Sequence, residues 1–204
     1  MIRQTVPLAL FFLFSLALTG CDNESSDGPS DQVKNTLPES AFKTIEWTDL
    51  MPQEDLDALT NPPSYITDVE DGSPEDELAS EMQSAKPIDP NDPYQQALVS
   101  KRIIPEMDGK RIRLPGFVVP LEYDEDQTIT EFFLVPFFGA CIHVPPPPPN
   151  QIIHVTYPEG FKIDVLYEPF WVSGTLKTTL IKNDVATSAY SLEMVRYEVY
   201  TEEE

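Results

Sequence analysis

Both histidines of the chain and one of its two cysteines fall within a single stretch of 14 residues. They are Cys141, His143 and His154. Cys141 and His143 are two positions apart, so on an extended chain their side chains point to the same face. A thiolate with two imidazoles suits Zn²⁺, with copper as second choice, and three protein ligands leave one coordination position open. The sequence therefore predicts a zinc site built from these three side chains.

Five consecutive prolines separate His143 from His154. The run consists of Pro145, Pro146, Pro147, Pro148 and Pro149. Polyproline forms a stiff extended helix that has no backbone donor and rises about 3.1 Å per residue. Such a segment either fixes the Cys–His pair against His154 or offers a rigid apolar surface to a partner, since polyproline docks into aromatic grooves. Both roles remain open, and the five prolines are candidate partner-binding residues.

The other cysteine, Cys21, follows a short secretory signal. Arg3 supplies a positive charge, and the mostly apolar run 6–18 is too short to span a bilayer permanently. Leu18-Thr19-Gly20-Cys21 resembles the bacterial lipobox, in which the peptide is cut before a cysteine that receives a diacylglycerol. We predict that residues 1–20 are removed and that Cys21 carries a lipid anchor.

The net charge indicates how the protein attaches to the membrane and which ligands it does not bind. The chain has 35 acidic and 13 basic residues, a net charge of −22. Nucleic-acid affinity depends on Lys and Arg neutralising phosphates, so we expect no nucleic-acid partner. The acidic chain also repels anionic headgroups, which leaves the lipid as its anchor. Asp22 after the lipidated cysteine resembles the signal that retains lipoproteins in the inner membrane, so we predict the periplasmic face of that membrane.

Once Cys21 is acylated, Cys141 is the only thiol left and no disulfide can form within the chain. A lone thiol in an oxidising compartment is a liability unless it is buried, metal-bound or reactive. Besides the metal site, two interpretations stay open. Cys141 acts as a nucleophile with a histidine base, or it packs as a small hydrophobe while both histidines make structural hydrogen bonds.

Five segments with strand-like patterns must position this cluster. Glycine and proline residues flank these segments. In one of them the alternation of apolar residues shifts by one position near Met194-Val195, which indicates a β-bulge. Five short strands over about 100 residues predict an all-β domain, a small five-stranded OB-like barrel, with a β-sandwich as the alternative. The expected strands are 109–121 with a kink at Pro115-Gly116, 128–135, 151–156, 170–176 and 189–199.

Four regions follow from composition. Residues 1–20 are the signal peptide, 21–41 an acidic flexible tether, 42–101 an irregular extension, and 102–201 the barrel. The extension carries short helices, expected near 53–59 and 94–99, and it packs on the barrel because Trp47 needs a surface to cover it.

Segments 47–52, 109–121, 138–151 and 172–176 resemble the bacterial family called domain of unknown function 3299. The resemblance spans about residues 45–200, and Gly-Ala-Cys-x-His-Val-Pro is its most specific stretch. It implies no established activity. Some members are encoded beside envelope ABC transporters and metal-uptake components, which implies an inner-membrane ABC transporter component as partner.

These observations favour a lipoprotein that is accessory to metal handling or transport, with zinc as its metal. The alternatives are a subunit of an envelope ABC transporter that binds no metal, and a small periplasmic thiol enzyme.

Overall fold

The structure is a computed structural model that describes residues 37–68, 89–124, 126, 128–140, 146–163 and 166–201. All of them belong to Val33–Glu204, one of the two compact units into which the chain divides. The predicted signal peptide, the lipid site Cys21 and tether residues 21–36 lie outside the described residues. In the described part, no helix is long and apolar enough to cross a membrane.

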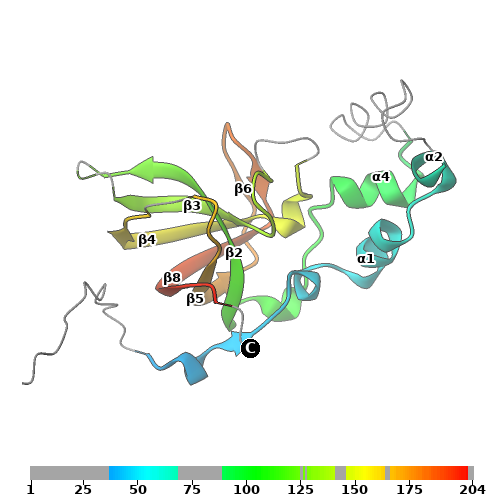
Figure 1. The fold of residues 1–204 in the computed structure, drawn as a ribbon. Coiled ribbons are helices and arrows are strands. Elements are labelled where there is room, and N and C mark those ends of the chain that lie inside the picture. Colours follow the sequence, from blue (N-terminus) through cyan, green and yellow to red (C-terminus); the bar gives the residue numbers. More distant parts are fainter. Residues whose placement is uncertain are drawn as a thin grey trace, which may run out of the picture. The chain divides into compact units, whose positions relative to one another are not determined.

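Five strands close into a barrel. Its neighbours follow the order β2-β3-β4-β8-β5, and β5 pairs back with β2 (Figure 1). The β4–β8 pair is parallel and the other barrel pairs are antiparallel. The closed all-β barrel confirms the predicted OB-like class rather than the sandwich. The strands are β2 (Arg111–Tyr123), β3 (Ile129–Val135), β4 (Ile153–Phe161), β5 (Phe170–Lys177) and β8 (Tyr190–Val199).

Strand β2 changes partner at its middle. Its first half, 111–116, pairs with β5, and its second half, 117–123, pairs with β3. The exchange falls at Pro115 and Gly116, where the sequence predicts a kink. A Cβ on Gly116 would lie 2.8 Å from Cγ of Leu134, so glycine is what lets β3 approach this closely.

The predicted bulge in the last strand is confirmed. Ser173 of β5 pairs with Arg196, and Gly174 pairs with Met194, so Val195 is an extra residue of β8 between the two pairs. The extra residue explains why the inward-facing positions of β8 change phase after Met194.

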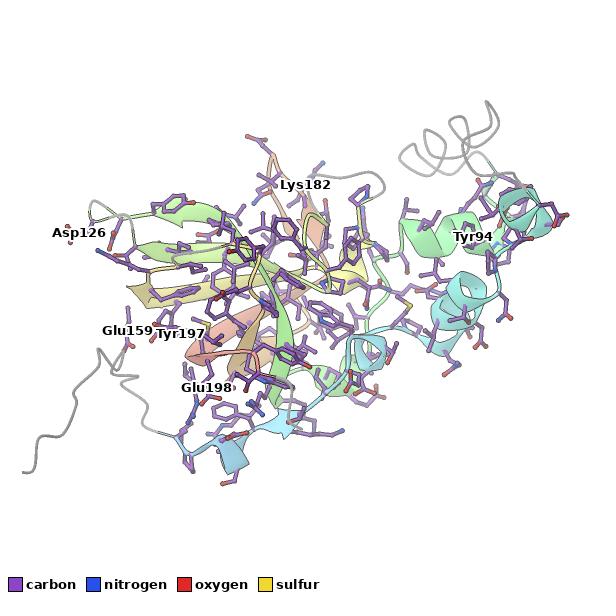
Figure 2. The ribbon with its side chains drawn as sticks, viewed as in Figure 1. Tyr94, Asp126, Glu159, Lys182, Tyr197 and Glu198 are labelled. Atoms are coloured by element: carbon purple, nitrogen blue, oxygen red, sulfur yellow. The ribbon has the colours of Figure 1, made fainter. Side chains whose placement is uncertain are left out.

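Aromatic rings pack together in the barrel interior. Ring centroids lie 4.6 Å apart for Phe161 and Tyr197, and 6.2 Å apart for Tyr157 and Phe161. Phe170 completes the group at 6.4 Å from Tyr197, which is labelled in Figure 2. The Tyr157 hydroxyl donates to a carboxylate oxygen of Glu159 at 3.0 Å. Burial, followed by this hydrogen bond, raises the pKa of Tyr157 to about 12.

This raised pKa predicts a loss of stability in alkali. An unfolded tyrosine ionises near pKa 10.0, so the folded state holds the proton more tightly. The stabilisation is complete below about pH 10 and is lost as pH rises through about 12. Over that window we expect the wild type to lose about 2 kcal/mol of unfolding free energy relative to Tyr157→Phe. Urea titrations of both proteins measure the difference, and parallel pH curves would contradict it.

Short elements precede the barrel and form the extension. Residues 37–41, which the sequence places in the tether, are described and end in η1. The helices expected near 53–59 and 94–99 are α1 and α4, and β1 pairs in parallel with β2. The elements are η1 (Glu39–Ala41), β1 (Lys43–Thr44), η2 (Trp47–Leu50), α1 (Gln53–Thr60), α2 (Ser64–Thr67), α4 (Pro93–Leu98) and η3 (Pro105–Met107).

Buried and partly buried hydrogen bonds hold the extension on the barrel. Tyr190, at the start of β8, is fully buried; its hydroxyl donates to the carbonyl of Leu50 at 2.9 Å and accepts from the N–H of Ile104 at 2.7 Å. The indole N–H of Trp47 donates to the carbonyl of Pro115 at 2.8 Å. The extension therefore contacts the barrel at both β2 and β8.

Candidate functional site

His154 points to the outer face of the barrel. It lies in β4 between Ile153 and Val155, which face the core, so strand alternation turns its imidazole outward. The residue is nevertheless only 6% exposed. Its Nε2 is 2.5 Å from Oε1 of Glu131 on the neighbouring strand β3, and its ring contacts the Phe133 ring edge-on at 5.9 Å. A carboxylate and an aromatic ring therefore fix the imidazole.

The bond to Glu131 assigns the two ring nitrogens of His154. A carboxylate only accepts, so Nε2 carries the hydrogen in this contact, and in a neutral imidazole the lone pair is then on Nδ1. Among the described residues, no hydrogen-bond partner of Nδ1 is found. Metal-bound histidines characteristically donate their other N–H to a carboxylate in this way. Glu131 has no sequence signal of such a role, because its outward position in a strand is typical of any solvated glutamate.

A second apolar cluster links His154 to the cysteine segment. It lies on the outer face and consists of Phe133, Val135, Ala140 and Ile152. Ala140 is fully buried and is the last described residue before Cys141. Phe133 belongs to the same cluster as Ala140 and contacts the His154 imidazole, so Ala140 lies on the face of the barrel that carries His154.

Cys141, His143 and Pro145 lie outside the described residues. Within the described ranges, no three His, Cys, Asp or Glu side chains gather closely enough to hold a metal ion. His154 and Glu131 are the two such groups that the structure brings together here.

The proline run packs into the protein at its C-terminal end. Pro147 and Pro148 are buried, Pro149 is partly buried, and Pro146 is exposed. The carbonyl of Pro149, which begins η4 (Pro149–Gln151), accepts from the N–H of Ala189 at 2.7 Å. Of the four described prolines, Pro146 is thus the one that a partner reaches most readily in this conformation.

A buried polar network fixes the residue that follows the prolines. Asn150 is fully buried and donates from Nδ2 to Oδ2 of Asp55 at 3.2 Å. The same carboxylate accepts from Oγ of Ser100 at 2.6 Å and pairs with the guanidinium of Arg102. Helix α1 and the segment after α4 therefore position the end of the loop. The sequence does not distinguish buried Asp55 from its exposed neighbour Glu54.

The outer face of the barrel near His154 is acidic. Glu131 pairs with Thr156, and Thr156 pairs with Glu193 across β3, β4 and β8. Glu122 of β2 lies beside Glu131 on the other side. The corresponding strands of OB-fold proteins bind oligonucleotides, whereas carboxylates here repel a phosphate backbone.

Fold and site together define a small OB-like barrel protein with an outward histidine–carboxylate pair. The chain belongs to the family described as a protein of unknown function, DUF3299, whose model matches residues 47–199. A crystal structure of a DUF3299 family protein from Pseudomonas aeruginosa PAO1 is similar, at 34% identity and a TM-score of 0.57. That match covers 80% of this chain and 99% of the other. No curated protein matches the chain.

Proposed function

We propose that this protein is a lipid-anchored envelope lipoprotein that binds zinc and is accessory to metal handling or transport. Cys21 anchors it to the periplasmic face of the inner membrane, and Cys141, His143 and His154 are the ligands. The observation that carries the proposal is the buried His154, whose Nε2 lies 2.5 Å from Oε1 of Glu131, so that Nδ1 is the ring nitrogen available to a metal.

Charge and geometry support metal binding at this place. The contact with Glu131 occupies Nε2 and leaves Nδ1 as the ring nitrogen that can bind a metal, the arrangement typical of metal-bound histidines. Thiolate and imidazole ligands around an ion that keeps one open position suit transfer to another protein. The inner-membrane ABC transporter components implied by the family resemblance would be the recipients or donors.

Metal content of the purified mature protein tests the proposal. Native mass spectrometry is expected to show one zinc ion per chain, lost in Cys141→Ser and His154→Ala. Glu131→Gln removes the carboxylate that orients His154, so we expect zinc affinity to fall about 10- to 100-fold in competition titrations. Glu122→Gln on β2 is the matched control and should bind zinc like the wild type. Equal zinc affinity in the wild type and His154→Ala would refute the site.

A non-metal interaction subunit of an envelope transporter is the second candidate. Phe137 and Phe138, immediately before the cysteine segment, are 48% and 55% exposed. Adjacent exposed aromatic side chains characteristically mark interaction surfaces. A folded, metal-free protein in which Cys141 resists thiol reagents would favour this candidate. Rapid modification of Cys141 in the metal-free protein would instead favour the third, a small thiol enzyme.

A further inference from the structure

A pocket lies in the barrel wall where β2 changes partner. At this point the end of β3 and the start of β5 separate on either side of Gly116. The pocket has a volume of about 260 Å³. Three aromatic and three proline side chains supply its walls: Trp47, Phe117, Tyr200, Pro115, Pro136 and Pro169.

Hydrogen bonds hold the walls of this pocket in place. The indole N–H of Trp47 donates to the Pro115 carbonyl at 2.8 Å, and the Trp47 carbonyl accepts from Nε2 of Gln151 at 2.9 Å. The N–H of Tyr200 donates to the carbonyl of Pro169 at 2.9 Å. Because these contacts are already made, a ligand would not have to order the walls when it binds.

The apolar surface continues beyond the pocket. The ring of Phe138 lies 6.1 Å from that of Phe117, centroid to centroid. Phe137 and Phe138 are about half exposed, and the residues that line the pocket carry no charge. Pocket and phenylalanine pair thus form one aromatic surface, called here the seam surface. Flat aromatic and proline walls accommodate proline rings and aliphatic side chains of an extended peptide.

Charge decides which occupant fits the seam surface. Exposed Glu46 and Glu168 directly precede Trp47 and Pro169, and the whole chain carries −22. A second copy of this chain would place its own Glu46 and Glu168 against these two carboxylates, which disfavours a dimer here. The same negative charge would repel anionic lipid headgroups. We propose that the seam surface binds an extended segment of a partner protein that has proline or aliphatic anchors flanked by Lys or Arg. The proposal is independent of zinc binding.

Two synthetic peptide libraries test this binding by fluorescence anisotropy with the mature protein. Both vary proline, leucine and valine at central positions; one has arginine flanks and the other glutamate flanks. Arginine-flanked peptides are expected to bind at least about tenfold more tightly, with an affinity that falls as salt rises. Equal binding of both libraries, or binding of neither, would overturn the proposal.

Variants locate the binding on the surface. Tyr200→Ala and Phe138→Ala are expected to weaken arginine-flanked peptides at least about fivefold. Tyr123→Ala, which removes a 58% exposed tyrosine from the far end of β2, is the control and should leave binding unchanged. Phe138 is exposed, so its truncation leaves the fold intact. Unchanged binding in Phe138→Ala, a dimer that depends on Phe138, or capture by anionic vesicles in place of peptide would each contradict the assignment.

Discussion

Cys21→Ser is expected to move the protein from the membrane pellet to the soluble fraction. Several acyl chains, each contributing about 0.8 kcal/mol per buried methylene, hold a lipoprotein stably on a bilayer. The rest of the chain offers no electrostatic substitute, because 35 acidic residues face 13 basic ones and anionic lipids repel it. When residues 1–20 are replaced by a signal peptide that is cleaved without lipidation, removing the acceptor thiol therefore removes the predicted attachment.

Cell fractionation with detergent phase partitioning measures this effect, and Cys141→Ser is its matched control. That variant removes the other thiol and should stay with the membrane. Separation of the two membranes then tests the compartment, where Asp22 predicts the inner membrane. Cys21→Ser that stays with the membrane would contradict the lipid anchor. Wild-type protein recovered in the outer membrane would contradict the predicted compartment.

Gly174→Ala is expected to destabilise the barrel severely. A Cβ on Gly174 would lie 2.3 Å from the carbonyl oxygen of Glu193 and 2.6 Å from Cδ2 of Leu192. The first of these atoms is backbone in the neighbouring strand β8, directly beside the bulge at Val195, so it cannot move without breaking the β5–β8 pairing. We expect a loss of about 3 kcal/mol or more in the free energy of unfolding.

Gly109→Ala separates this steric effect from backbone conformation. Gly109 has φ +71°, and a Cβ there would meet no atom within 4 Å. Alanine at that position strains the backbone alone, which costs about 1–2 kcal/mol. Urea unfolding of both variants measures the contrast. A smaller loss in Gly174→Ala than in Gly109→Ala would mean that β5 and β8 are not packed this closely.

The barrel could be predicted because its strands alternate regularly. Inward positions of β5 and β8 follow a period of two, and the single break in the period marks the bulge at Val195. One strand is longer than predicted. The sequence predicts it over 151–156, but residue 151 ends η4 and β4 begins at Ile153. In the structure β4 continues to Phe161. Pro158 and Gly160 lie between the residue pairs Glu131–Thr156 and Ile129–Phe161, where the pairing of β3 with β4 is irregular.

Contacts between distant segments could not be predicted. Glu131 and His154 are 23 positions apart and meet only because β3 and β4 pair with Glu131 opposite Thr156. Asp55 and Asn150 are 95 positions apart, and both are of residue types that usually lie on the protein surface. The local sequence does not say how strands pair or where a helix packs. For this reason the sequence does not indicate that Glu131 orients His154, or that Asp55 and Asn150 form a buried network.

Cobalt(II) bound in place of zinc tests most directly whether Cys141 and His154 hold one ion. We predict that the mature protein with bound cobalt shows an intense sulfur-to-cobalt charge-transfer band and the visible spectrum of a tetrahedral ion. Cys141→Ser should lose the band, and His154→Ala should bind cobalt far more weakly. A protein without the band, or one in which His154→Ala retains the wild-type spectrum and affinity, would contradict the shared site.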